Sequence, residues 1–311
     1  MSISSGDWLI LSLGAALLLI AWAIGVFRAR SILGPDRCRG ESIVALAGIA
    51  AAGWTAWQLV PILFALPFMT APTTALASAP TSAPASQPAA LNLTPMQTVS
   101  LGILGASLGL VTLVGGNLLA RPGGLRRIGL GPEKLPAGIL AGVLGAIVVI
   151  PITLAATLAT DLLYQRLHVQ HPEAHELLLI LGGADRPDLR AMVLISATIL
   201  APVFEEIFFR GHVQTLLAHA VGRMFRPSDL LLGAPVPAQA PSAAARWIAV
   251  VVTSLVFALV HTPWMIPPIF VLSLGLGYAY ERTGNLWTPI VMHALFNILN
   301  VSVFVYISPP H

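Results

Sequence analysis

The sequence predicts an all-α fold, a polytopic transmembrane helical bundle of about eight spans, and three observations support that prediction. Of the 311 residues, 56% are hydrophobic and only 9% are charged, whereas a soluble domain carries roughly 25% charged residues. The mean hydropathy is +0.84. Several apolar stretches reach the roughly 20 residues that an α-helix needs to cross a bilayer. This composition excludes both a soluble globular domain and a disordered chain.

The candidate spans, in chain order, are residues 8–27, 43–66, 99–119, 138–160, 191–209, 247–263, 266–280 and 286–307. The first four and the last are clear apolar runs. The sixth and seventh are short and are interrupted by Pro263, Pro267 and Pro268. Proline inside a helix removes a backbone hydrogen bond, so we expect irregular backbone where these two spans meet.

A tract rich in Ala, Pro, Ser and Thr separates the second span from the third. It contains no charged residue and has four prolines between residues 70 and 90, so it cannot build a core. We expect residues 68–98 to form a flexible extracytoplasmic linker. The linker divides the chain into an N-terminal transmembrane hairpin, residues 1–67, and a transmembrane helical bundle, residues 99–311.

The basic residues predict the orientation in the membrane. Thirteen of the 16 lysines and arginines, Arg210 among them, follow odd-numbered spans, and basic loops remain in the cytoplasm. Both termini are then extracytoplasmic, and we expect a multi-pass protein of a bacterial plasma membrane. The pI of about 9.5 reflects these short loops, so the partner it indicates is the lipid bilayer and not a nucleic acid. The only cysteine, Cys38, excludes an intrachain disulfide.

The few polar side chains within apolar runs are informative, because an ionisable residue inside a span costs roughly 2.5–3.5 kcal/mol on insertion scales. Glu205, Glu206 and Arg210 stand at the end of the fifth span. Glu206 and Arg210 share a helix face with the acid first, which favours an ion pair. Glu205 points about 100° away and is left as a free carboxylate that suits a general base. A helix end at the lipid headgroups would carry the same residues.

Two further polar groups follow in the sixth and eighth spans. Phe257 and His261 share one helix face, and His293 and Asn297 share another. The second pair offers two side chains that suit a developing oxyanion, although hydrogen bonds between helices would use the same residues. At 1.5 Å per residue, Glu205 lies about 8 Å and His261 about 21 Å from the cytoplasmic side. A common site then requires a tilted sixth helix or a different helix boundary.

In this order, the patterns EExxxR, FxxxH and HxxxN resemble the CPBP intramembrane protease family. That family includes the type II CAAX prenyl endopeptidases and bacterial proteins of bacteriocin processing and self-immunity. Gly211 after the first motif, and residues 275–278 and 281–284 before the third, are also similar to the family. The resemblance covers about residues 190–300, which we expect to be the protease-like core.

The resemblance implies an intramembrane endopeptidase that hydrolyses a peptide bond of a membrane-associated or lipid-modified peptide or protein. It divides six side chains among three roles, which are activation of a water by Glu205 and His261, stabilisation of the oxyanion by His293 and Asn297, and support of the site by Glu206 and Arg210. A zinc ion held by Glu205, His261 and His293 is also compatible with these donors. The choice between a metalloprotease and a glutamate-dependent enzyme without a metal stays open.

The same residues are compatible with other functions, and the sequence also bears on other protease classes. A membrane immunity or scaffold protein would retain the fold without catalysis, and a small transporter would line a solute path with the same polar residues. The segment His175–Leu179 begins like a zinc-binding HExxH helix but lacks the second histidine. No GxSxG motif is present, which argues against a serine hydrolase of that type.

Overall fold

The computed structural model of the chain describes residues 4–34, 43–66, 93–120, 123–170, 176–183, 186–224 and 240–307. Within these ranges the secondary structure is helical and contains no strand, which confirms the predicted all-α fold. The principal helices are α1 (Ser5–Ala23), α2 (Ile43–Ala65), α3 (Pro95–Ala120), α5 (Leu135–Arg166), α11 (Ala243–Leu259), α12 (Ile266–Thr283), α13 (Trp287–Ile307) and a continuous helical segment, Pro187–Met224. Two short helices, α4 (Gly124–Arg127) and α6 (Glu176–Gly182), lie in connections.

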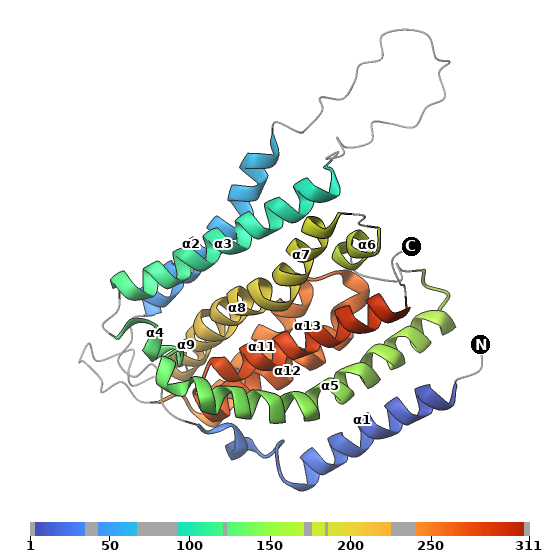
Figure 1. Cartoon of the computed structure of the whole chain (residues 1–311). Coiled ribbons are helices and arrows are strands. Elements are labelled where there is room, and N and C mark those ends of the chain that lie inside the picture. The colour runs from blue at the N-terminus through green and yellow to red at the C-terminus, as the bar shows by residue number, and fades with distance from the viewer. Residues whose placement is uncertain are drawn as a thin grey trace, which may run out of the picture.

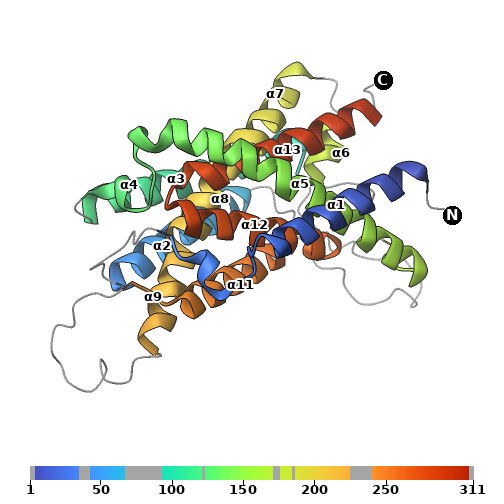
Figure 2. The ribbon, with the colours of Figure 1, turned by 90° about the horizontal axis from the view of Figure 1, so that it is seen from below.

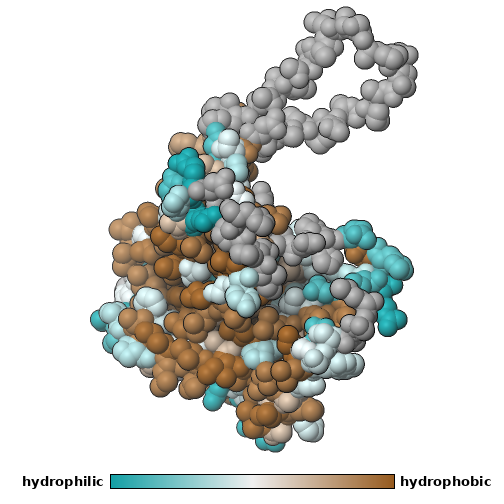
Figure 3. Space-filling view, turned by 45° about the vertical axis from the view of Figure 1, so that its right-hand side comes forward, coloured by the Kyte–Doolittle hydropathy of each residue, from teal (hydrophilic) through white to brown (hydrophobic). Residues whose placement is uncertain are grey.

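Six of the described helices are long and apolar enough to cross a membrane, and α11 is a shorter apolar helix of 17 residues. Large hydrophobic side chains cover the outside of the bundle, and Leu119, Val44 and Leu9 are at least 70% exposed. Figure 3 shows this apolar surface as a nearly continuous brown area over the helices. An outer surface of this kind is stable in contact with lipid, so the chain is an integral, multi-pass membrane protein.

The helices alternate in direction, so that α1 begins and α13 ends at the same end of the bundle (Figure 1). The two N-terminal helices, however, occupy opposite sides. Helix α1 packs along α5, whereas α2 packs along α3, and Figure 2 shows the same separation from below. The N-terminal hairpin predicted over residues 1–67 is therefore two helices with different packing partners. Most of the predicted linker, residues 68–98, lies outside the described residues. Helix α3 begins at Pro95, so its first turn lies within the range predicted for the linker.

Helices α2 and α3 approach closely because α3 presents two glycines, four residues apart, to its neighbours. A Cβ atom at Gly105 would lie 2.7 Å from the carbonyl oxygen of Trp57 and 2.6 Å from Cγ of Pro61. At Gly109 it would lie 2.6 Å from the ring of Phe204, the residue before Glu205. Small residues at this spacing allow close helix packing in membranes. The contact therefore positions α2 and α3 against the segment that carries the acidic pair.

The segment Pro187–Met224 is a single helical rod of 38 residues, much longer than the predicted fifth span, 191–209. It consists of α7 (Pro187–Ile195), the π-helical η4 (Ser196–Leu200), α8 (Ala201–Glu206), the π-helical η5 (Ile207–Gln214) and α9 (Thr215–Met224). The predicted span ended near Glu206 and Arg210, but these two residues pair with each other inside the protein and do not end the helix. Glu205 consequently lies near the middle of the rod.

Helix α11 ends at Leu259, so His261 lies in the turn before the 3₁₀ helix η6 (Pro263–Met265) and not inside a span. Together with the longer rod, this removes the mismatch in depth between Glu205 and His261. Proline at position 263 favours the short helical turn because its φ angle is already set for a helix start.

A second buried ion pair joins the ends of the helices at the basic side of the bundle. Arg246 of α11 and Glu281 of α12 are 2.9 Å apart, with side chains 4% and 1% exposed. Gln214 of η5 donates to the other oxygen of Glu281 at 2.9 Å and to the carbonyl of Gly277 at 3.1 Å. This network fixes the C-terminal half of the rod against α11 and α12.

The glycine contact between α2 and α3 predicts a position-specific effect of a methyl group. We expect Gly105→Ala to lower the unfolding temperature in detergent, because overpacking costs about 1–3 kcal/mol. Gly102, three residues earlier on α3, has no atom within 4 Å of the added Cβ. Gly102→Ala therefore gains helix propensity without a clash and is the matched control. Equal unfolding temperatures for the two variants would contradict the close approach.

The buried ion pair predicts a strong loss of stability when one partner is removed. Glu281→Ala leaves Arg246 buried without its carboxylate, which costs roughly 3–5 kcal/mol. Asp188→Ala removes an exposed partner of Arg186 and should change stability little, because water screens surface pairs. Chemical unfolding of the purified variants measures both, and a Glu281→Ala protein as stable as Asp188→Ala would contradict the buried network.

Candidate active site

The acidic pair of α8 lies in the interior of the bundle and faces two different sets of partners. Glu206 and Arg210 form the predicted ion pair, with Oε1 and Nη1 2.9 Å apart and with side chains 0% and 1% exposed. The Arg210 guanidinium also donates to Oγ of Ser273 on α12 at 2.7 Å and lies over the ring of Phe257 at 4.6 Å. Three helices thus contribute groups that compensate one buried cation, as a low-dielectric environment requires.

The imidazole of His293 connects the two glutamates. Its Nδ1 lies 2.9 Å from Oε1 of Glu206, and its Nε2 lies 3.9 Å from Oε2 of Glu205. Because a carboxylate paired with Arg210 only accepts hydrogen bonds, Nδ1 of His293 must carry the proton of this contact. The ring is therefore fixed in orientation, with Nε2 directed at Glu205.

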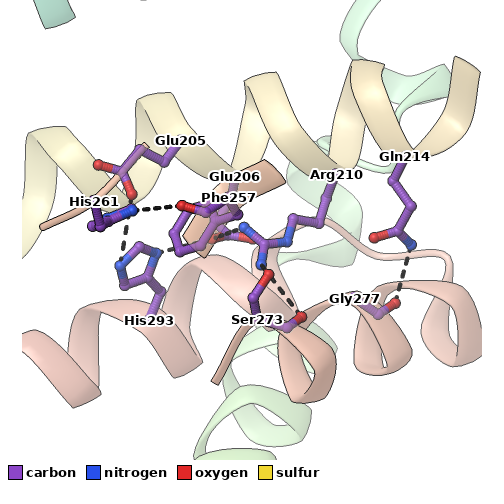
Figure 4. Close-up of polar contacts among 9 residues, drawn as sticks. All are labelled: Glu205, Glu206, Arg210, Gln214, Phe257, His261, Ser273, Gly277 and His293. Atoms are coloured by element: carbon purple, nitrogen blue, oxygen red, sulfur yellow. Dashed lines mark hydrogen bonds and ion pairs between the residues drawn. The ribbon is translucent and has the colours of Figure 1, made fainter. Parts of the chain in front are cut away.

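His261 approaches the same place from the end of α11. Its Nδ1 lies 2.6 Å from the carbonyl oxygen of Phe257, so Nδ1 is the protonated nitrogen and Nε2 of the neutral ring is an acceptor. The ring of Phe257 packs against both imidazoles, at 4.6 Å from His261 and 5.9 Å from His293. Figure 4 shows the two histidines with Phe257 and, on the neighbouring helix, Glu205, which is joined to His293 by a dashed line.

Glu205 is the acid of the pair that accepts no hydrogen bond from the residues that the structure describes. Its side chain is 15% exposed, and its Oε2 is buried without a hydrogen-bond partner. Oε2 of Glu206 is also unpartnered, but its Oε1 is occupied by Arg210 and His293. Nε2 of His293 lies 3.9 Å from Oε2 of Glu205, so the Glu205 carboxylate can accept a hydrogen bond from a water beside this ring.

Asn297 lies one turn beyond His293 on α13, but its amide has a different neighbour. Its Nδ2 donates to the backbone carbonyl of Ala197 in η4 at 2.7 Å, away from the glutamates. The structure thus brings five of the six predicted side chains into one connected group and places the sixth on the backbone of the rod. The group contains Glu205, Glu206, Arg210, His261 and His293.

Sequence reasoning missed two participants that the structure adds. Ser273 is fully buried in α12 and accepts from Arg210, and the signal for it was a hydroxyl within an apolar run. The second is the pair of His212 and Asn117, which are both fully buried and 2.9 Å apart. This pair joins η5 to α3 two residues after Arg210 in the rod.

The donors do not fit the zinc site that the sequence left open. Within the part of the chain that the structure describes, no three His, Cys, Asp or Glu side chains are placed to hold a metal ion together. The Nδ1 atoms of both imidazoles are hydrogen-bonded to protein oxygens, which leaves only the Nε2 atoms as potential ligands.

Comparison with known proteins agrees with the motifs. Residues 187–299 match the family model described as type II CAAX prenyl endopeptidase Rce1-like. The chain matches no curated protein and no solved structure significantly. The matched segment runs from the first residue of the rod to α13 and contains all three motifs. The resemblance predicted from them is confirmed, and residues 187–299 form an Rce1-like domain of the type II CAAX prenyl endopeptidase family.

Proposed function

We propose that the chain is an intramembrane endopeptidase in which Glu205 activates a water for attack on a peptide bond. The observation that carries this proposal is the partly buried Glu205 carboxylate, which has one buried oxygen without a partner and lies 3.9 Å from Nε2 of His293. A general base needs this combination of proximity and unused acceptor capacity. Glu206 differs because its Oε1 is occupied by Arg210 and His293.

His261 is the second acceptor for the water. Its Nδ1–H is donated to the carbonyl of Phe257, which leaves the Nε2 lone pair free for a water proton. Glu205 takes the other proton as the water oxygen attacks the carbonyl carbon. The proton on Glu205 is then available to the leaving amine, so the carboxylate is regenerated at the end of the cycle.

His293 faces the oxyanion that develops on the substrate carbonyl. Since Nδ1–H is used by Glu206, the ring donates to the oxyanion only when Nε2 is protonated too. Carboxylates on both sides of the ring balance the charge of that form. Glu206 and Arg210 support this step by holding the imidazole, in the way that a buried carboxylate orients a catalytic histidine.

The substrate class that we propose is a lipid-modified or membrane-associated peptide. The matching family model is described as type II CAAX prenyl endopeptidase Rce1-like, and the site lies near the middle of a helix that crosses the apolar bundle. A peptide with a lipid or apolar anchor reaches such a depth more readily than a polar one, because burial of the anchor compensates desolvation of the peptide bond.

The first test removes the base and the second acceptor. We expect Glu205→Gln and His261→Ala each to lower kcat by about 10²–10⁴-fold on a farnesylated peptide with a C-terminal CAAX sequence, because general base catalysis contributes about that much. The unfolding temperature should stay near that of the unmodified protein. Glu133→Gln, at an exposed carboxylate, is the matched control.

Retained cleavage in Glu205→Gln would contradict the proposed role of this carboxylate. If Glu205→Gln also kept a cellular phenotype of the protein, the result would support a non-enzymatic immunity or scaffold protein. An unlipidated peptide of the same sequence tests the substrate class, and equal kcat/KM for both peptides would contradict the role of the lipid anchor.

The second test concerns the metal. We expect 1,10-phenanthroline and EDTA to leave cleavage unchanged after prolonged incubation and removal of the chelator–metal complex, because the donors do not assemble a metal site. Elemental analysis of the purified protein accompanies the assay. Loss of activity that added zinc restores would contradict a reaction without a metal.

A further inference from the structure

The amide of Asn297 donates a hydrogen bond to the backbone of the rod and not to another side chain. Its Nδ2 donates to the carbonyl oxygen of Ala197 at 2.7 Å, across 100 positions of sequence. Ala197 lies in the π-helical segment η4, which precedes the acidic pair by less than three turns. The amide therefore connects α13 to the part of the rod that begins about two helical turns before Glu205.

The carbonyl of Ala197 needs an external donor because of Pro202. In η4 the backbone N–H of Ala201 bonds to the carbonyl of Ser196, five residues back, and not to that of Ala197. In the same register the donor for Ala197 is residue 202, which is proline and has no N–H. A membrane interior offers no water to such a carbonyl, so the Asn297 amide replaces the missing donor.

The π-helical segment also determines which way the acidic pair faces. An extra residue in one turn rotates all later residues by about 100° relative to an uninterrupted α-helix. Glu205 and Glu206 follow this turn at the end of α8. Helix α13 contacts the rod on both sides of Pro202, through Asn297 to Ala197 and through His293 to Glu206. The two contacts together fix the rotation of the acidic pair relative to the imidazole.

We propose that Asn297 is a positioning residue, which satisfies the carbonyl left open by Pro202 and thereby holds Glu205 and Glu206 in register with His293. The observation behind this role is that Nδ2 of Asn297 donates to the backbone of the rod. The kinetic part of this inference rests on the proposed peptidase activity. The structural part, the dependence of Asn297 on Pro202, does not.

The test is a double-mutant cycle of Asn297→Ala and Pro202→Ala, with the intact protein in detergent and the farnesylated CAAX peptide as probe. Alanine at position 202 restores a backbone N–H, so the carbonyl of Ala197 or its neighbour regains a donor from its own helix. Each of the four proteins is assayed for kcat, for KM and for unfolding temperature. A cycle is required because residues that share one hydrogen bond are not additive.

We expect Asn297→Ala to lower kcat by about tenfold or more while KM changes less than about twofold, since misplacement of a catalytic group affects the transition state and not binding. The unfolding temperature should fall by about 3 °C or more, because a buried carbonyl is left unsatisfied. In the Pro202→Ala background, the same substitution should change neither kcat nor the unfolding temperature appreciably.

Asn300→Ala is the matched control. Asn300 is one turn further along α13, and its Nδ2 donates to the carbonyl of Phe296 within its own helix. Its replacement should alter neither quantity in either background. The control separates loss of an amide on α13 from loss of the contact with the rod.

Two results would overturn the proposal. The first is an equal loss of kcat from Asn297→Ala in both backgrounds with an unchanged unfolding temperature, which indicates a direct role at the oxyanion. The second is an equal fall of unfolding temperature in both backgrounds. That result would mean that the contribution of Asn297 to stability does not depend on the N–H missing at Pro202. If the unmodified protein does not cleave the peptide, that result contradicts the peptidase proposal for this substrate, and the unfolding temperatures alone decide the role of Asn297.

Discussion

The buried ion pair of Glu206 and Arg210 is the constraint on which the rest of the site depends. Ionised groups at this depth are costly unless each has a partner, and here the partners come from other helices. Arg210 donates to Ser273 of α12, and Glu206 accepts from His293 of α13. The need to compensate two charges therefore joins α12 and α13 to the rod. The position of the Glu205 carboxylate, one residue before the pair, follows from that junction.

The rod departs from α-helical geometry on both sides of the acidic pair, and side chains replace the backbone bonds that are altered. Thr215 donates through Oγ1 to the carbonyl of Arg210, and His212 contacts the carbonyl of Ile207, each five residues back. Irregular backbone at membrane depth is stable only where the protein supplies the partners. π-helical turns of this kind often occur at functional sites, because the extra residue changes the direction in which later side chains point.

Prediction from sequence succeeded where the physics is local and failed where it is not. The spacing of Glu206 and Arg210 on one helix face predicted their ion pair, and apolar runs predicted the bundle. The fifth span ended too early in the prediction because charged residues in an apolar run resemble a helix end at the headgroups. Their partners on α12 and α13 were not visible in the local pattern, so the 38-residue rod appeared as a short span. Likewise the helix before His261 was predicted to end at residue 263 but ends at Leu259, and the turn that contains this histidine was expected only as a proline break.

Composition, the length of apolar runs and three short motifs by themselves determined the membrane-spanning fold and the family of residues 187–299. These features are local, since each depends on residues within a few helical turns. Only the tertiary structure decided that Ser273 supports Arg210, that Asn297 faces the backbone of Ala197, and that α1 and α2 lie on opposite sides of the bundle. Contacts of this kind join residues 63 to 100 positions apart. They depend on how far each helix is rotated and shifted against its neighbours, and that is settled by close packing at glycines and by the pairing of buried charges.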